Sequence, residues 1–297
     1  MVSVQTIPQK ALITGASSGI GAAYAERLAS REYDLVLVAR TASRLEQLAA
    51  NLAREYGVHV EAVPADLSVA TDLAAIDRRI RDDESLTMLV NNAAVAGSGP
   101  LAATDPDRID AMIRLNTLAV ARLAAAAADR FTKNGAGTLV NISAVTGLFP
   151  DAEDALYRAT RTFVLSLSQS LHEELAAHGV HVQTVLPGVT KTALWERAGV
   201  PLERFPGDAV MAVGELVDAA LAGLELGEAV TIPSLSNPAD WEALNHAQRQ
   251  LLPQLSRNRA APRYWRRIAR HYRKRLLAAL ESGDAETKLA ETHTTPA

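Results

Sequence analysis

The chain has 297 residues and no cysteine, and its formal net charge is −4 at neutral pH. The lack of cysteine excludes disulfides, thiolate catalysis and cysteine-based metal sites, and it favours a reducing compartment. The slightly acidic balance gives no general reason to expect nucleic acid as a partner. With 48% hydrophobic and 22% charged residues, the composition is typical of a globular protein.

The N-terminal residues pass from polar positions directly into a strand-like run, with no cationic flank before an apolar segment. We therefore expect no signal peptide. The alanine-rich run at 119–128 is interrupted by Arg122, so no membrane span is expected. Together these features predict a cytoplasmic protein.

Short β-branched runs alternate with amphipathic segments up to Pro233. The expected strands are 11–14, 34–39, 58–65, 87–92, 137–143, 180–187 and 228–233. The expected helices between them are 20–31, 41–56, 68–82, 105–132, 154–178 and 210–226. Buried strands that alternate with helices indicate a parallel sheet covered on both faces. Right-handed crossovers then favour an α/β, doubly wound (Rossmann) fold with a seven-stranded parallel sheet.

The composition changes after Pro233. Residues 234–280 predict two further helices with proline punctuation, as a helical C-terminal extension of the catalytic domain formed by residues 1–233. So short a segment would lack a core of its own. Residues 281–297 are polar and are expected to be disordered.

The first strand is followed by a glycine-rich turn that opens a helix. Gly15 allows a tight turn, Gly19 lets backbone N–H groups approach a pyrophosphate, and Gly21 lets helix and strand pack closely. The helix N-terminus supplies positive potential for phosphates. An ordinary strand–turn–helix is the alternative, but the position in the first βα unit favours a dinucleotide site. Its expected residues are Gly15, Ser17, Ser18, Gly19, Ile20 and Gly21.

The second expected strand ends at Arg40, where an NAD site usually has an acidic residue. A guanidinium there can pair a 2′-phosphate in a bidentate manner, with Arg44 adding charge and Ser17 a hydroxyl. The alternative is that Arg40 is a solvated residue at a strand end. We expect NADP(H) rather than NAD(H).

Seven motifs make the chain resemble the short-chain dehydrogenase/reductase family, in its single-domain, NADP-preferring form, from Lys10 to about Pro233. They are TGASSGIG (14–21), ADL (65–67), NNAA (91–94), IRLNTL (113–118), NISAVTG (141–147), YRATR (157–161) and LPGVTKT (186–192). The resemblance implies hydride transfer between NADP(H) and a carbonyl or secondary alcohol. It also implies a homodimer or homotetramer formed through helices 105–132 and 154–178.

The resemblance assigns cofactor contacts after the strands. Asp66 and Leu67 would lie beside the adenine, and Asn92 and Ala93 would pass behind the nicotinamide ribose, although Ala94 replaces the usual glycine. The nicotinamide would contact Pro187, Gly188, Thr190 and Thr192. Asn116 would belong to the proton relay. From the residue alone, a polar side chain satisfied by neighbouring backbone is the favoured interpretation of Asn116.

Tyr157 stands where the family has its proton-transferring tyrosine. A phenol is a poor base at neutral pH and needs a nearby cation to favour phenolate. The family uses a lysine four residues later, and this chain has Arg161. Arginine supplies the charge and can hold ribose hydroxyls, but its shape differs and it does not lose a proton.

The family's catalytic serine corresponds to Ala144, with Ser143 just before it. Neighbours at an extended strand end point to opposite faces, so Ser143 should face away unless the backbone bulges. Three interpretations stay open. The first is a working oxidoreductase with Tyr157 as acid/base and an atypical site. The second is an NADP(H)-binding protein with little redox turnover, used for other chemistry or regulation. The third is an exchange introduced to silence the enzyme.

The segment 190–211 follows the last motif, where the family places a mobile substrate lid. Its apolar side chains predict a small apolar carbonyl or alcohol as substrate, although each can equally pack the lid on the core. They are Leu194, Trp195, Val200, Leu202 and Phe205.

A basic amphipathic helix is predicted between Arg257 and Leu280, with eight arginines, one lysine and no acid. Such a helix can lie on an anionic membrane surface, or dock on its own domain or a partner subunit with arginines outward. Of these alternatives, docking on its own domain or on a partner subunit is the favoured expectation. Nucleic acid is not expected as a partner, because one helix is a small basic footprint on an acidic protein.

Overall fold

The structure, a computed structural model, describes residues 9–97, 99–149, 154–197 and 200–281. The chain divides into two compact units, residues 1–235 and 236–297. Apart from Glu281, the tail predicted to be disordered lies outside the described residues.

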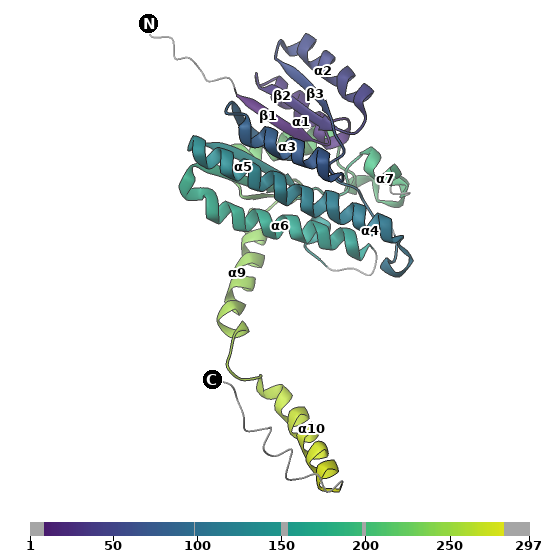
Figure 1. Cartoon of the computed structure of the whole chain (residues 1–297), viewed down its shortest axis with the longest axis vertical. Helices are drawn as coiled ribbons and strands as arrows, with labels where there is room; N and C mark the ends of the chain where they lie inside the picture. Colours follow the sequence, from purple (N-terminus) through teal and green to yellow (C-terminus); the bar gives the residue numbers. More distant parts are fainter. Residues whose placement is uncertain (1–8, 98, 150–153, 198–199, 282–297) are drawn as a thin grey trace. The chain divides into compact units, whose positions relative to one another are not determined.

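The first unit is built on a seven-stranded sheet in the order β3-β2-β1-β4-β5-β6-β7 (Figure 1). Every neighbouring pair of strands is parallel, which confirms the predicted doubly wound Rossmann fold. The strands are β1 (Lys10–Thr14), β2 (Asp34–Ala39), β3 (Val60–Pro64), β4 (Leu86–Asn91), β5 (Gly137–Ile142), β6 (Val180–Val185) and β7 (Val230–Thr231). The edge strand β7 is shorter than its predicted range of 228–233.

Helices cover both faces of this sheet because successive strand side chains point to opposite sides. Ile13 of β1 belongs to the core under one helical layer, whereas its neighbour Leu12 belongs to the core under the other. The first layer contains α1 (Gly19–Ala29), α2 (Ala42–Tyr56) and α8 (Val213–Glu225). The second contains α3 (Ala70–Asp82), α5 (Val120–Asn134) and α6 (Ala155–Leu175).

One long helical run joins α4 (Pro106–Ile113), a π-helical turn (Arg114–Ala119) and α5. Asp105 caps it by accepting a hydrogen bond of 2.8 Å from the Asp107 N–H, and proline occupies the first turn. By length and composition alone, this run contains a stretch apolar enough to cross a membrane. Leu123, Ala127 and Phe131 are buried in the core, so here the apolar character serves packing within the fold.

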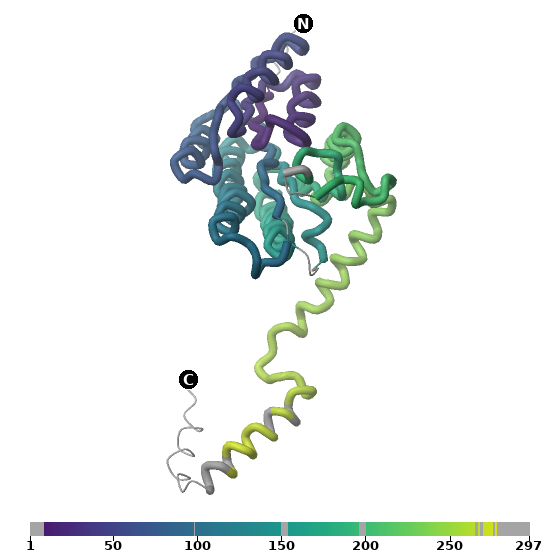
Figure 2. Tube along the Cα trace, turned by 90° about the vertical axis from the view of Figure 1, so that its right-hand side faces the viewer, coloured from purple at the N-terminus to yellow at the C-terminus, as the bar shows by residue number. Residues whose placement is uncertain are grey.

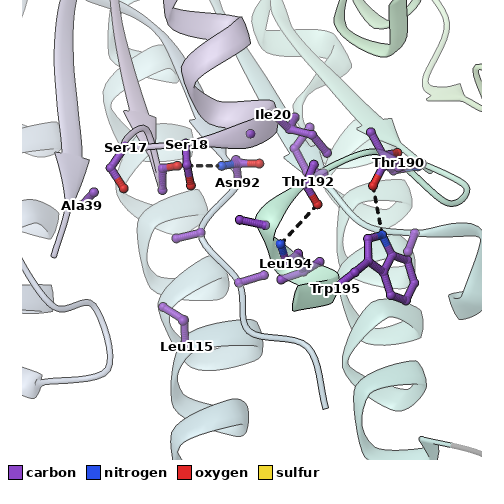
Figure 3. A pocket seen from close by; sticks show the side chains of 18 of the residues that line it. Ser17, Ser18, Ile20, Ala39, Asn92, Leu115, Thr190, Thr192, Leu194 and Trp195 are labelled. Carbon is purple, nitrogen blue, oxygen red and sulfur yellow. Dashed lines mark hydrogen bonds between the residues drawn. The ribbon is translucent and has the colours of Figure 1, made fainter. Parts of the chain in front are cut away.

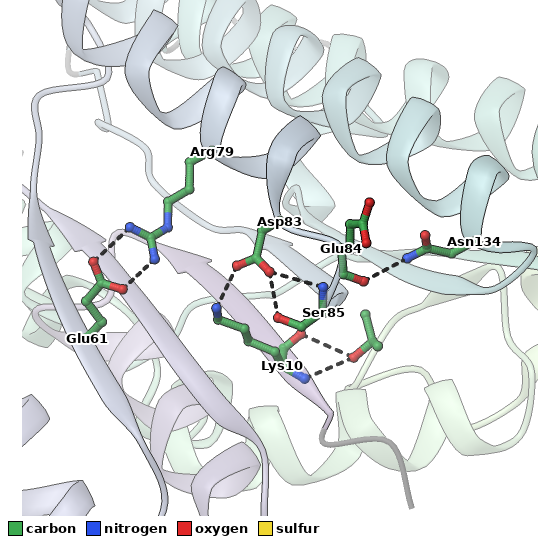
Figure 4. A network of polar contacts seen from close by, with 8 residues as sticks. Lys10, Glu61, Arg79, Asp83, Glu84, Ser85 and Asn134 are labelled. Carbon is green, nitrogen blue, oxygen red and sulfur yellow. Dashed lines mark hydrogen bonds and ion pairs between the residues drawn. The ribbon is translucent and has the colours of Figure 1, made fainter.

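Polar contacts join strands to neighbouring segments at the edge of the sheet where the strands begin (Figure 4). Lys10, which begins β1, donates a 2.6 Å hydrogen bond to Asp83 just before β4. Arg79 of α3 forms an ion pair with Glu61 of β3. These contacts join strands to the helical layer at one edge and leave the carboxyl edge for the loops that form the site.

The second unit contains α9 (Pro238–Leu255) and α10 (Pro262–Glu281). Asn237 caps α9 through a 3.2 Å hydrogen bond from the Ala239 N–H, and a proline opens each helix. No residue of α9 is buried. The two helices agree with the helical C-terminal extension predicted from the sequence.

Candidate active site

A cavity of about 450 Å³ lies beside the carboxyl ends of β1, β2, β4, β5 and β6. Strand order reverses between β1 and β4, which is where open α/β sheets bind ligands. Most of the residues predicted for the site line this cavity: Gly15, Ser17, Ser18, Gly19, Ile20, Arg40, Arg44, Asp66, Leu67, Asn92, Ala93, Ser143, Tyr157, Arg161, Pro187, Gly188, Thr190 and Thr192. Of the predicted set, Gly21 and Asn116 lie outside its lining.

The glycine turn needs glycine for two separate reasons. Gly15 and Gly19 have φ values of 67° and 57°, in the left-handed region that favours glycine. At Gly21, a Cβ would lie 2.5 Å from the Gly15 carbonyl oxygen, so close packing excludes any side chain. The turn therefore keeps its backbone N–H groups close to the cavity at the start of α1.

Asn92 holds this turn in place. Its Nδ2 donates to the Thr14 carbonyl oxygen at 2.9 Å, and its backbone N–H donates to the Thr14 hydroxyl at 2.9 Å. The Ala93 N–H donates to the same hydroxyl at 3.0 Å. The Asn92 amide is therefore a structural link between β1 and β4, in addition to its place on the cavity wall (Figure 3).

The predicted adenosine end contains two cations and a carboxylate. Arg40 is 61% exposed in its side chain, with Nη1 at 4.0 Å from Asp66 Oδ2. Asp66 accepts hydrogen bonds of 2.9 and 2.6 Å from the Ser68 N–H and hydroxyl. Burial acts to raise the pKa of Asp66, but these bonds and the Arg40 charge lower it overall. Asp66 is thus fixed as a carboxylate, while Arg40 remains accessible to a ligand phosphate.

Tyr157 and Arg161 lie one turn apart on α6, at the inner end of the cavity. The Arg161 guanidinium is 5.2 Å from the Tyr157 ring centroid and only 2% of the residue is exposed. It donates to the Ile142 and Asn116 carbonyl oxygens at 3.3 and 3.5 Å. Among the described acidic residues, none forms an ion pair with Arg161. A buried positive charge therefore stands beside the phenol without a carboxylate counterion.

Burial is the largest influence on the pKa of Tyr157 and raises it above the ordinary value for a phenol. The Arg161 charge acts to lower it, and Asp154 acts to raise it further. Tyr157 is consequently neutral at neutral pH and can donate a proton. Burial also lowers the pKa of Arg161, with Tyr157 acting in the opposite direction.

The structure shows how Ser143 and Ala144 are placed directly after β5. The Ser143 hydroxyl donates to the Arg161 carbonyl oxygen at 2.7 Å and is committed to the backbone of α6. Ala144 follows in extended conformation, with φ −167° and ψ 154°, and lines the cavity. Ser143 therefore turns its hydroxyl to the α6 backbone, as strand alternation predicts, although the residue lines the cavity. A catalytic role for Ser143 stays a prediction.

Asn116 sits in the π-helical turn and is fully buried. Its Oδ1 accepts from the Val95 N–H at 2.9 Å, and its Nδ2 donates to the Val95 carbonyl at 2.8 Å. The side chain therefore clamps the loop after β4. Its Nδ2 also donates to the Thr160 hydroxyl at 3.2 Å, and that hydroxyl accepts from Arg161 Nε at 3.4 Å. Both the side chain and the backbone carbonyl of Asn116 therefore connect it to Arg161.

The substrate side of the cavity is closed by the segment after β6, which includes the short helix α7 (Ala193–Arg197). Trp195 Nε1 donates to the Thr190 carbonyl at 3.0 Å, and its ring lies 5.0 Å from that of Phe205. Figure 3 shows Thr192, Leu194 and Trp195 across the pocket from Ser17 and Ser18. The glycine turn and this segment lie close together, since a Cβ on Gly19 would lie 3.3 Å from a side-chain carbon of Thr192. Figure 2 traces the backbone of both segments.

Sequence reasoning assigned no role to several wall residues, most of which are apolar and so offer no chemical signal. Further cavity-lining residues include Val38, Ala39, Thr41, Ala65, Leu115, Ile142, Val145, Thr146 and Val189. Most of them lie close to a predicted strand end, and that position is the signal that could have found them. Thr14 begins the TGASSGIG motif, but sequence reasoning assigned it no separate role. Its hydroxyl accepts hydrogen bonds from the Asn92 and Ala93 N–H groups and so links the turn to the loop after β4.

Residues 9–200 match the family described as short chain dehydrogenase. This protein belongs to that family. The duck (Anas platyrhynchos) protein named very-long-chain 3-oxoacyl-CoA reductase is 32% identical over 188 residues, which cover 62% of this chain and 60% of the relative. The match thus spans less than two thirds of that relative's length.

Solved structures provide longer matches. A short-chain dehydrogenase from Sphingobium yanoikuyae in complex with NADPH is 50% identical, with a TM-score of 0.84, and the match covers 86% of this chain and 99% of the other. The bulky-bulky ketone specific alcohol dehydrogenase from Comamonas testosteroni is 44% identical, with a TM-score of 0.80 and coverage of 87% and 99%.

Proposed function

We propose that this protein is an NADP(H)-dependent oxidoreductase that transfers a hydride between the nicotinamide and an apolar carbonyl or secondary alcohol, with Tyr157 as the acid/base. The observation that carries the proposal is one cavity that combines the glycine turn, Arg40 and a neutral Tyr157. The NADPH complex of a protein 50% identical to this one supports the same cofactor.

The residues present fit NADPH. The turn at Gly15 and Gly19 presents backbone N–H groups and the α1 N-terminus to the phosphates. Arg40, exposed and close to Asp66, can turn onto a 2′-phosphate, with Arg44 beside it. When bound, the cofactor supplies the hydride. Tyr157 then supplies the proton to the substrate oxygen, because burial keeps its phenol protonated.

The substrate side favours an apolar molecule. Leu194 and Trp195 line the cavity, and the indole N–H of Trp195 is already used by the Thr190 carbonyl. What the indole offers a ligand is therefore mostly apolar ring surface. The Comamonas relative is specific for bulky-bulky ketones, which supports a ketone with two sizeable apolar groups as the substrate.

The first test is NADPH oxidation against a panel of apolar ketones, with NADPH binding measured on the same preparation. We expect turnover with at least one ketone, and its loss in Tyr157→Phe with NADPH binding unchanged. Trp195→Ala should raise the ketone KM more than the NADPH Kd. Binding of NADPH without turnover across the panel, together with equal inactivity of Tyr157→Phe, would refute the catalytic proposal.

The second candidate function is NADP(H) binding with little redox turnover. Two observations favour it: Ala144 offers no hydroxyl at the family's serine position, and Ser143 is committed to Arg161. This candidate predicts normal NADPH affinity with rates near background. Activity that appears only in Ala144→Ser would identify the missing donor as the cause.

For assembly, we propose a homodimer through the long helical run and α6. Ile113, Leu118 and Phe163 are 43%, 45% and 39% exposed on these helices, despite being large and apolar. Apolar side chains on adjacent exposed helices suit a self-complementary interface. Light scattering should show an even number of subunits, and Phe163→Glu should reduce it. A monomeric wild type would refute the proposal.

A further inference from the structure

The second unit carries a charge pattern that catalysis does not use. Between Arg257 and Arg275 there are eight arginines, one lysine and no acidic residue. Residues 1–235 carry 28 acidic and 19 basic side chains, whereas residues 236–297 carry 6 and 11. The positive charge of this protein is thus concentrated in one segment that includes α10.

The helical spacing of α10 separates apolar and basic positions. Positions that recur every three or four residues fall on one helix face, and here they hold Trp265, Ile268, Tyr272, Leu276 and Leu280. Arg273 and Arg275 fall on opposite edges of this face. Arg267, Arg270 and Lys274 fall on the opposite side of the helix. Basic residues therefore surround an apolar stripe on both edges.

The described side chains of α10 are exposed to solvent. They include Arg263, Arg267, Arg270, Arg273, Lys274 and Arg275. Tyr272, on the apolar face, is 60% exposed, and Leu277 is 49% exposed. In the single chain this apolar face therefore has no protein cover at Tyr272, and a partner that covers it must also accept a dense positive charge.

The sign of the charge identifies the partner class. A helix that docks on protein with its polar face in water usually carries both signs. The acidic body of a second copy offers carboxylates interspersed with basic residues, and several of those carboxylates are already paired, as in Arg27–Asp218, Arg81–Asp77 and Arg79–Glu61. A nucleic acid offers a continuous polyanion but no apolar layer that could cover the apolar stripe. An anionic membrane surface supplies both a negative potential and an apolar layer.

We propose that α10 binds in the plane of an anionic lipid surface, with the face that contains Tyr272 toward the acyl chains and the arginines at the headgroups. Arginine at the edges of the stripe can reach lipid phosphates while its aliphatic part stays against the apolar layer. The acidic body is repelled by the same surface, so binding depends on the helix. This attachment requires no turnover.

The test is sedimentation of the full chain with vesicles of phosphatidylcholine alone, or with about one third phosphatidylglycerol, at low and high salt. We expect binding only to the anionic vesicles and its loss at high salt. The double variant Arg273→Gln, Arg275→Gln, which removes the arginines at the edges of the stripe, should bind roughly 30-fold more weakly, from about 1 kcal/mol for each basic residue near the surface. Trp265→Ala with Ile268→Ala should weaken binding while leaving the charge unchanged.

A matched control removes two exposed charges elsewhere: Arg54→Gln, Arg78→Gln. It should bind like the wild type. Equal loss in the control, or equal binding to neutral vesicles, would overturn the proposal. So would tighter binding to RNA than to anionic vesicles. A change of subunit number in the α10 variants without lipid would instead make the helix a docking arm, and would also overturn it.

Discussion

Ala144→Ser should restore the hydrogen-bond donor that the site lacks. Ala144 is in extended backbone, φ −167° and ψ 154°, which serine adopts without strain. It is 9% exposed and lines the same cavity as Tyr157. A hydroxyl added there can therefore meet the substrate oxygen that Tyr157 protonates, whereas the neighbouring Ser143 hydroxyl is held by the Arg161 carbonyl at 2.7 Å.

The size of the effect follows from the energetics of such donors. Removal of one preorganised donor to a developing oxyanion typically costs about 100-fold in kcat or more, or about 2.7 kcal/mol. We therefore expect Ala144→Ser to raise kcat for ketone reduction by about 100-fold. NADPH affinity should stay within about twofold, since the added group faces the transition state rather than the phosphates.

The assay is steady-state NADPH oxidation with the best ketone of the panel, paired with NADPH titration by fluorescence. Ala144→Cys is the matched control, because a thiol fills a similar space and is only a weak donor. It should give little of the gain. The reasoning fails if Ala144→Ser leaves kcat unchanged, or if cysteine and serine raise it equally.

Other changes test separate parts of the site. Arg40→Ala should weaken NADPH by about 10-fold or more and leave NADH nearly unchanged in parallel titrations, because only NADPH has a 2′-phosphate; equal losses would contradict this. Gly21→Ala should lower Tm by several degrees, because its Cβ would lie 2.5 Å from a backbone oxygen, whereas Gly207→Ala, with no atom within 4 Å, should not. Asp154→Asn should move the rise of alcohol oxidation with pH to lower pH, because Asp154 acts to raise the pKa of Tyr157; an unmoved profile in pH-dependent kinetics would count against that coupling.

The fold and the cofactor end of the site were accessible from sequence because their signals are local. A strand periodicity of two, a helix after each strand, and glycines at fixed offsets each reflect a short-range requirement. Strand alternation also predicted that Ser143 faces away, and its hydroxyl indeed bonds to Arg161. The short β7 lay beyond this reasoning, since its length depends on hydrogen bonds with β6 more than on its own residues.

The inner end of the site depends on contacts between distant positions, which local patterns do not encode. Asn116 bonds to Val95, 21 residues away, and Arg161 reaches the Asn116 carbonyl, 45 residues away. From the sequence, Asn116 had two interpretations, a relay member or a polar residue satisfied by backbone. The structure shows the backbone contacts of its side chain, and it also places the side chain on the Thr160 hydroxyl and the carbonyl against Arg161. Membership of a relay stays a prediction. Only three-dimensional packing brings these groups together.

We expect Arg161 to lower the stability of the fold while it supports catalysis. Arg161 is 2% exposed, and its hydrogen bonds of 3.3 to 3.5 Å go to neutral oxygens, with the Tyr157 ring as its other neighbour, so its desolvation is poorly compensated. Replacement of a buried ion by an apolar side chain of similar volume is often neutral or stabilising by about 1–4 kcal/mol. Arg161→Met should accordingly hold or raise Tm.

The same variant should lose activity. The Arg161 charge acts to lower the pKa of Tyr157, so without it the phenol titrates at still higher pH and the rise of alcohol oxidation with pH moves to higher pH. Calorimetry and a pH–rate profile on one preparation check both halves. A Tm that falls by several degrees would show that the contacts with the Ile142 and Asn116 carbonyls are structural. A Tm that holds while turnover is lost would show that the buried charge is maintained for its effect on Tyr157.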